Sequence, residues 1–296
     1  MMPSIFRRRR GFSLAEVLVT MGILGILGVA LTRLLLTQGR FADHQNALRN
    51  ARAVSRQSLN VLMSDLRMVQ DSGGIDSAAT DGSGIRVIVP YRFGLNCGVA
   101  GDANVVSMLP VDSLVLEQAV YAGFAWRNAF GRYTVVYPDN PLTTDAPVST
   151  GSSAQCTGNA AGQAQIRLTS VSGRSGVMLD LSPSQPAAPL GQAIFMFQRI
   201  TYSFAASSAF PGKIGLWRTV QGGTAEEIVA PFDSDARFRF WTAGADTSVL
   251  SPPDLSDIRG VDVVFAANST YTPTGRTSVA KSKVVTSMFF KNVRSY

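Results

Sequence analysis

The sequence has little of the chemistry that catalytic and metal sites need. Its 296 residues include one histidine, His44, and only two cysteines, Cys97 and Cys156. A Ser-His-Asp triad or a Cys-His pair would have to use His44, which lies in a polar stretch that we expect to be helical. Zinc sites built from several cysteine and histidine ligands are excluded by these counts. We therefore expect no enzyme activity, no metal, no cofactor and no small-molecule substrate.

Paired carboxylates are the remaining route to an active site. Asp112 with Glu117, and Asp233 with Asp235, are close in sequence and could serve glycoside hydrolysis. Their spacing matches no catalytic signature. Acids near turns are also more often solvated, or cap the chain, than catalytic. A membrane-anchored enzyme therefore remains an alternative that the sequence does not favour.

Charged residues are sparse, at 16% against 46% apolar residues, which is typical of a globular chain with one large or two small domains. The net charge is +7, and four of these charges come from a run of arginines at positions 7 to 10. The arginines that could contact DNA are scattered: Arg127, Arg132, Arg167, Arg174, Arg199 and Arg218. DNA binding needs a clustered basic face, so it is a third and weaker alternative.

One long segment is almost free of charge. Residues 12–36 read FSLAEVLVTMGILGILGVALTRLLL, where Glu16 is the only charged residue before Arg33. About 20 apolar residues cross a bilayer as a helix, so this segment is long enough. Because the arginine run precedes it, the positive-inside rule places residues 1–10 in the cytoplasm and the chain after residue 36 outside. The sequence predicts a single-pass membrane protein whose globular part lies outside the cytoplasm.

Residues 41–70 contain neither glycine nor proline, and their apolar side chains recur at spacings of three and four. This pattern predicts an amphipathic helix whose stripe is Leu48, Ala51, Ser55, Leu59, Leu62, Leu66 and Val69. We expect one nearly continuous helix from Phe12 to Ser72, ending at Ser72-Gly73-Gly74.

After Gly74 the pattern changes to short β-type runs separated by turn residues. We expect strands at 85–93, 113–118, 133–137, 166–169, 177–181, 193–204, 216–220, 226–229, 237–241, 258–266 and 283–293. The sequence Gln221-Gly222-Gly223-Thr224 predicts a hairpin turn, and residues 139–165 and 182–191 are expected to be surface loops.

These elements predict an α+β protein, a long N-terminal helix packed on an antiparallel β-rich domain. A helix stripe and a sheet face each need an apolar partner, so we expect Leu59, Leu62, Leu66 and Val69 to pack beneath the sheet. The expected regions are a basic leader (1–11), a membrane helix (12–36), an amphipathic helix (37–72) and a globular domain (73–296).

The sequence RRRRGFSLAEV resembles the N-terminal motif of type IV prepilins and type II secretion pseudopilins. The resemblance rests on the leader Arg7, Arg8, Arg9 and Arg10, then Gly11, Phe12 and an acid, Glu16, five positions after the glycine. The apolar span and the amphipathic continuation accompany it. The implied fold is the pilin fold, and the implied function is that of a filament subunit.

The resemblance implies that a prepilin peptidase cuts between Gly11 and Phe12 and methylates the new Phe12 amine. Gly11 has no side chain, so the backbone can lie close to a protease at that point. A charge within hydrocarbon costs about 2.5 to 3.5 kcal/mol at a span's centre, so Glu16 needs a partner. The family assigns Glu16 to pairing with the N-terminus of a neighbouring subunit during assembly.

The implied partners are the peptidase, other pilin or pseudopilin subunits that contact the N-terminal helix, the inner-membrane assembly platform and the lipid bilayer. Many major pilins have a proline within the apolar span, whereas this chain has Thr32 and Arg33 in that region. Major pilins are also usually about half as long. Length and strand content resemble a PilW-like minor pilin, with a J-type secretion pseudopilin as the alternative.

The two cysteines both follow the membrane span. The predicted orientation places Cys97 and Cys156 outside the cytoplasm, where thiols oxidise, and an even count leaves no thiol unpaired. We expect a disulfide between them, with two unpaired thiols as the alternative. Closing a loop of about 60 residues would stabilise the domain by roughly 4 kcal/mol in the chain-entropy model.

Overall fold

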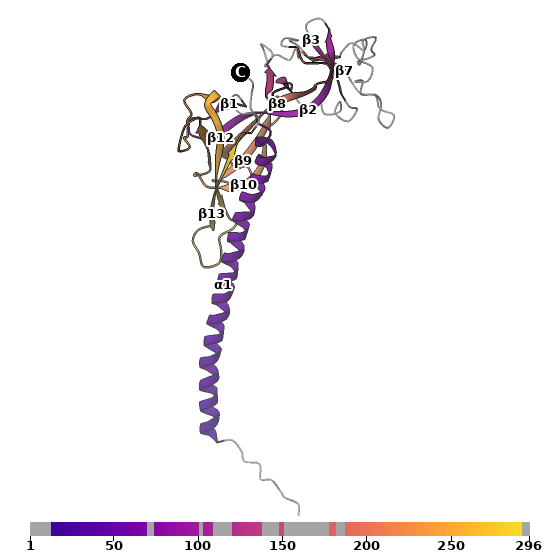
Figure 1. The fold of residues 1–296 in the computed structure, drawn as a ribbon. Coiled ribbons are helices and arrows are strands. Elements are labelled where there is room, and N and C mark those ends of the chain that lie inside the picture. Colours follow the sequence, from indigo (N-terminus) through magenta and orange to yellow (C-terminus); the bar gives the residue numbers. More distant parts are fainter. Residues whose placement is uncertain are drawn as a thin grey trace, which may run out of the picture. The chain divides into compact units, whose positions relative to one another are not determined.

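The computed structural model describes residues 13–69, 74–100, 103–108, 120–137, 148–150, 178–181 and 187–291. One long helix, α1, precedes a series of antiparallel strands, as Figure 1 shows. This order confirms the predicted α+β class with an N-terminal helix and a β-rich domain.

The helix α1 runs from Leu14 to Leu66 without interruption, which is about 80 Å at 1.5 Å per residue. It ends six residues before the predicted stop at Ser72. The amide of Met68 donates to Asp65 O (3.0 Å) and that of Val69 donates to Leu66 O (3.3 Å). These short-range bonds tighten the final turn, and Val69 is fully buried just beyond it.

Thirteen described strands form the sheet. They are β1 (Ile75–Ala78), β2 (Gly84–Ala100), β3 (Ala103–Ser107), β4 (Gly123–Arg127), β5 (Tyr133–Val136), β6 (Val148–Thr150), β7 (Met178–Leu181), β8 (Ala193–Ala206), β9 (Ile214–Val220), β10 (Glu226–Phe232), β11 (Arg237–Thr242), β12 (Ile258–Asn268) and β13 (Lys281–Phe289). The hydrogen-bonded path is β11-β12-β10-β9-β8-β2-β3-β7-β6, while β1 pairs with β2, β13 with β12, and β4 with both β5 and β8.

Most predicted strands are confirmed. The hairpin between β9 and β10 turns at residues 221–224, where Gly222 has a φ of 79°. Three strands were missed, β1, β3 and β4, and β6 lies within the predicted loop 139–165, so that loop assignment was wrong in part. The expected strands 113–118 and 166–169 lie outside the described residues.

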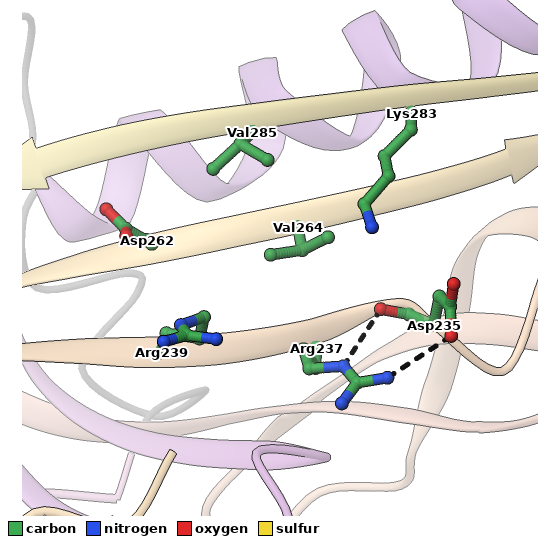
Figure 2. Close-up of a pocket in the computed structure, with 7 residues that line it drawn as sticks. All are labelled: Asp235, Arg237, Arg239, Asp262, Val264, Lys283 and Val285. Atoms are coloured by element: carbon green, nitrogen blue, oxygen red, sulfur yellow. Dashed lines mark hydrogen bonds and ion pairs between the residues drawn. The ribbon is translucent and has the colours of Figure 1, made fainter. Parts of the chain in front are cut away.

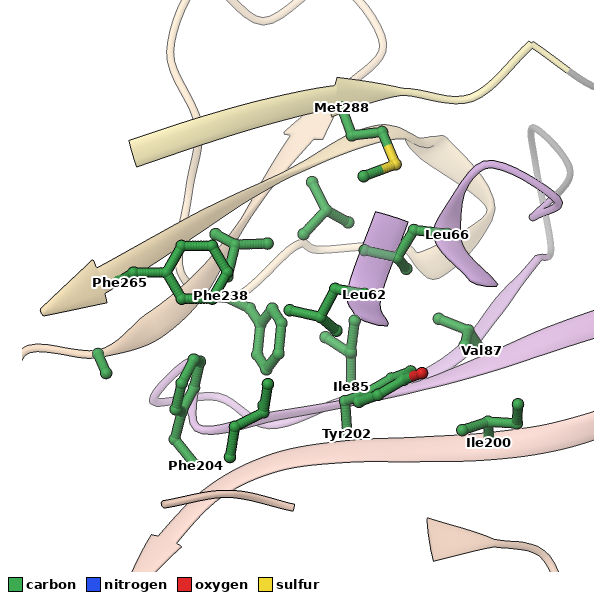
Figure 3. Close-up of a cluster of buried hydrophobic side chains, with 14 of the residues drawn as sticks. Leu62, Leu66, Ile85, Val87, Ile200, Tyr202, Phe204, Phe238, Phe265 and Met288 are labelled. Carbon is green, nitrogen blue, oxygen red and sulfur yellow. The ribbon is translucent and has the colours of Figure 1, made fainter. Parts of the chain in front are cut away.

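The main core lies between the second half of α1 and one face of the sheet (Figure 3). Leu62, Leu66 and Val69 are fully buried there, and Leu59 packs against the same cluster. Their partners include Tyr202 and Phe204 of β8 and three further aromatic side chains, Phe232, Phe238 and Phe265. These four side chains thus pack against the sheet, where the sequence placed them.

A second apolar cluster lies farther along the sheet. Strands β2 and β8 pair from Gly84 opposite Ser203 to Leu95 opposite Ala193, so they are long enough to contribute to both clusters. The second cluster contains residues from β3, β4 and β7, among them Val106, Phe124 and Leu179. Two strands that the sequence did not predict, β3 and β4, therefore contribute to this cluster beside the predicted β7.

A buried polar contact joins α1 to the sheet. The Tyr202 hydroxyl donates to Asp65 Oδ2 at 2.5 Å, and the Arg218 guanidinium lies 3.4 Å from the same oxygen. Burial, followed by the charge of Asp65, raises the pKa of Tyr202, so its hydroxyl stays protonated and remains a donor. This contact fixes the rotation of the helix about its axis relative to β8 and β9.

Tyr202→Phe is expected to destabilise the domain by about 1.5 to 3 kcal/mol, because the hydrogen bond to a charged, partly buried group is lost. Urea unfolding of a soluble fragment lacking residues 1–39 measures this change. A double-mutant cycle with Asp65→Asn isolates the pairwise energy. An unchanged urea midpoint in Tyr202→Phe would show that the contact contributes nothing.

Residues 269–280, which connect β12 to β13, form a compact unit with the part of α1 up to Asn50. The Thr274 amide donates to Asp43 Oδ2 (2.6 Å), and the Thr270 amide donates to Asn50 Oδ1 (2.9 Å). The Tyr271 hydroxyl donates to the Asp43 carbonyl oxygen at 3.3 Å. The connection is thereby attached to two turns of the helix.

This attachment should depend on pH. The Thr274 amide lowers the pKa of Asp43 from its ordinary value of 3.8, so the stabilisation is fully present above pH 3.8 and is lost as pH falls through the lower folded value. We expect the amide NMR shift of Thr274 to titrate with a midpoint below 3.8 and to lose this step in Asp43→Asn. A midpoint at or above 3.8 would contradict the contact.

Candidate functional site: the N-terminal helix

The first turn of α1 is closed by a reciprocal pair of hydrogen bonds. The Glu16 amide donates to Ser13 Oγ (3.3 Å), and the Ser13 amide donates to Glu16 Oε2 (3.5 Å). This is a capping box, in which a serine and a glutamate three residues later bond each other's amides; the Glu16 amide also donates to the Ser13 carbonyl oxygen (3.0 Å). This capping role of Glu16 was not predicted, although the spacing Ser-x-x-Glu is typical of a capping box.

Glu16 therefore has a local partner at the end of the helix where a negative charge is favourable. It is exposed on the single chain, so its carboxylate is also accessible to a group from outside. The next turn is supported by Thr20, whose hydroxyl donates to the carbonyl oxygens of Glu16 and Val17. An ordered helix start thus holds one carboxylate at a defined place.

The apolar part of α1 has no covering among the described residues. Large apolar side chains between Leu14 and Leu36 are 41% to 80% exposed. At three glycines in this stretch, Gly22, Gly25 and Gly28, a Cβ would meet nothing within 4 Å apart from the neighbouring residues and the helix's own backbone. So large an apolar surface needs lipid or other protein around it, and this is the one described helix that is long and apolar enough to cross a membrane.

The polar residues of this segment are accommodated within the helix. Thr32 Oγ1 donates to the Gly28 carbonyl oxygen and Thr37 Oγ1 donates to that of Arg33, both at 2.8 Å. Such bonds satisfy the hydroxyls without a partner from another chain. The region where many major pilins have proline is α-helical here.

The comparisons with known proteins bear on this segment. A family model described as the prokaryotic N-terminal methylation motif matches residues 6–32. The match covers the basic run, Gly11, Glu16 and most of the apolar segment. The match supports a protein of the type IV pilin and pseudopilin superfamily, a structural class whose motif implies processing by prepilin peptidase and assembly with other pilins. No curated protein and no solved structure matches the chain.

Several predicted site residues cannot be located. The leader arginines, Gly11 and Phe12 lie outside the described residues, so cleavage there stays a prediction. Cys97 is fully buried on β2, but Cys156 is outside the described residues and the disulfide likewise remains a prediction.

The acids considered for a membrane-anchored enzyme make other contacts wherever the structure describes them. Lys281 pairs with Asp233 and holds the pKa of that carboxyl below its ordinary value, whereas Asp235 pairs with Arg237. The two acids thus have separate cationic partners, unlike a catalytic pair. Asp112 and Glu117 are outside the described residues, and among those described no group of ligands could hold a metal ion.

Two of the arginines considered for DNA binding contact carboxylates of the domain itself. Arg199 lies 2.6 Å from Asp76 and is only 9% exposed, while Arg218 pairs with Asp65. Arg127 donates to the carbonyl oxygen of Gly131. These three arginines therefore make contacts within the domain. Arg167 and Arg174 lie outside the described residues.

Proposed function

We propose that this chain is a minor pilin subunit of a type IV pilus. It is inserted with residues 1–10 in the cytoplasm, cut after Gly11, methylated at Phe12, and then packed into a filament by α1. The observation that carries the proposal is the methylation motif at residues 6–32 on a helix with an exposed apolar surface and one carboxylate near its start.

The proposed role of Glu16 is to receive the Phe12 amine of a neighbouring subunit. Cleavage creates that positive amine, and two opposite charges attract more strongly in a medium of low dielectric than in water. The capping bonds to Ser13 hold the carboxylate in place before the partner arrives. The pair would offset the cost of placing either charge in an apolar environment.

The proposed partners follow from this route. The peptidase removes the leader, the lipid bilayer holds α1 before assembly, the inner-membrane platform delivers the subunit, and other pilins replace lipid around the helix. The exposed glycines of α1 allow close approach of neighbouring helices. DNA and small-molecule substrates have no place in the proposal.

The subtype rests on size and strand content. With 296 residues and thirteen described strands, the chain is large for a major pilin, which favours a PilW-like minor subunit. A J-type pseudopilin of type II secretion would have the same N-terminus. Co-purification with pilus subunits or with secretion subunits from the native host separates the two roles.

Gly11→Leu is expected to abolish processing, because the larger side chain prevents close approach of the peptidase to the scissile bond. The test expresses the full chain with prepilin peptidase and follows the loss of the leader by mass spectrometry. Gly11→Ala, which adds one methyl group, is the matched control and should be cut more slowly but still detectably. Normal processing of Gly11→Leu would contradict the proposed cleavage site.

A further inference from the structure

The last strand of the domain has an open edge. Among the described residues β13 pairs only with β12, in a continuous register from Gly260 opposite Phe289 to Asn268 opposite Lys281. The other side of this nine-residue strand has no hydrogen-bonded neighbour there. Such an edge is a template on which another extended chain can pair.

The groups that face the open edge can be identified from one bond. The Phe290 amide donates to the Arg259 carbonyl oxygen (2.9 Å), and amides alternate in direction along an antiparallel strand. The amides and carbonyls of Lys281, Lys283, Val285, Ser287 and Phe289 therefore point to the open edge. These residues are exposed, and Val285 (55%) and Phe289 (54%) present large apolar side chains there.

A hollow of about 420 Å³ adjoins this edge on the outer face of β11, β12 and β13 (Figure 2). Its floor is formed by Val264 and Val285, and cations stand on both sides, Arg237 and Arg239 on β11 and Lys283 on β13. Lys283 has no hydrogen bond or ion pair among the described residues. The hollow thus has an apolar floor and one cation free to pair.

The acids of the hollow are already engaged. Asp262 is 5% exposed and accepts a hydrogen bond from Trp241 Nε1 at 2.5 Å, and Asp235 lies 3.3 Å from Arg237. Trp241 in turn contacts Phe289, with ring centroids 5.7 Å apart. Neither acid pairs with Lys283 among the described residues, so this cation is available to an incoming carboxylate.

We propose that β13 binds an extended acidic segment of a partner protein, which adds to the sheet as its next strand. Its main chain pairs with the open edge, an acidic side chain lies opposite Lys283, and apolar side chains lie opposite Val285 and Phe289. This interaction belongs to the globular domain and is separate from filament packing through α1. It does not depend on the proposed pilin role.

Two other occupants fit the edge less well. DNA would bring phosphates close to Asp235 and Asp262, and it would leave the apolar floor without a partner. A second copy pairing antiparallel about Val285 would place Lys283 opposite Ser287 and Lys281 opposite Phe289, so Lys283 would gain no acid. An acidic partner strand would pair with Lys283, cover the apolar floor and hydrogen-bond to the open edge.

The probe is a fluorescein-labelled nine-residue peptide designed to pair antiparallel with residues 281–289. It carries valine opposite Phe289 and Val285, glutamate opposite Lys283 and Lys281, and threonine elsewhere. Fluorescence anisotropy with the full chain in detergent micelles should give saturable binding. A control peptide with lysine in place of both glutamates should bind at least tenfold more weakly.

Two pairs of variants locate the site. Ser287→Pro removes an edge amide and should weaken binding at least tenfold, whereas Ser287→Ala keeps the amide and should bind as wild type. Proline is tolerated on an edge strand whose amide faces outward, and circular dichroism confirms that the fold is kept. Lys283→Glu should weaken binding of the glutamate peptide and strengthen that of the lysine peptide.

The outcomes are distinct. Loss of binding in Ser287→Pro together with the exchanged preference of Lys283→Glu supports the proposal. Equal binding by Ser287→Pro and Ser287→Ala, equal binding of the two peptides, or no saturable binding at millimolar peptide would overturn it. Self-association of the full chain that Ser287→Pro abolishes, or Lys283-dependent binding of duplex DNA in place of the peptide, would replace the proposed occupant and equally overturn it.

Discussion

Glu16→Ala is expected to be inserted and cut normally but to be missing from sheared filaments. Insertion should be at least as efficient as in wild type because a costly charge is removed. Cleavage should continue because the leader and Gly11 are unchanged. Incorporation should fall by at least tenfold, since the Phe12 amine of the neighbouring subunit loses its counter-charge. Expression with the cognate machinery, N-terminal sequencing and quantification in sheared filaments measure all three steps.

The capping box makes a second variant necessary. Glu16→Ala removes both the charge and the bond to the Ser13 amide, whereas Glu16→Gln keeps a side chain that can cap. If the charge matters, both variants are absent from filaments. Incorporation of Glu16→Gln at the wild-type level would assign Glu16 to helix capping and contradict the proposed pairing, and failure of cleavage in either would move its role to the peptidase step.

Leu62→Ala and Leu66→Ala are each expected to cost about 2 to 5 kcal/mol of unfolding free energy, because both side chains are fully buried in the main core. Urea unfolding of the fragment lacking residues 1–39 measures the change. Leu190→Ala makes the same deletion at a side chain that is 47% exposed and should cost far less. Equal costs at all three positions would contradict the packing of α1 on the sheet.

Much of the helix could be predicted because its signals are local. The apolar run, the absence of glycine and proline from 41–70, and the spacing of Leu59, Leu62 and Leu66 each lie within a few turns. The end of α1 at Leu66 could not be placed, since helix-compatible residues continue to Gln70. Tertiary burial of Val69 and short-range bonds to Asp65 and Leu66 end it instead.

Two of the missed strands lack the alternation that identifies a half-buried strand. All five residues of β3 are buried, as are the first four of β4, so neither shows a period of two. The short β6 lies in a Ser- and Thr-rich stretch and is defined by its pairing with β7. Such strands depend on partners that are distant in sequence.

In the candidate site too, the features that are local in sequence could be predicted and those that need distant contacts could not. The motif around Gly11 and Glu16 is contiguous, so sequence alone pointed to it, and the capping role of Glu16 was readable from Ser13. The contact of Tyr202 with Asp65 spans 137 positions and could not be foreseen. The hollow beside β13 likewise requires the pairing of three strands, two of which are separated by a connection of twelve residues, 269–280.

The central claim is that this chain is a processed filament subunit, and the mature N-terminus tests it most directly. Mass spectrometry of the protein purified from its native membrane or filaments should find a chain that begins at Phe12 and carries one methyl group on its amine. A chain that keeps residues 1–11, or that begins at any other residue, would contradict the account.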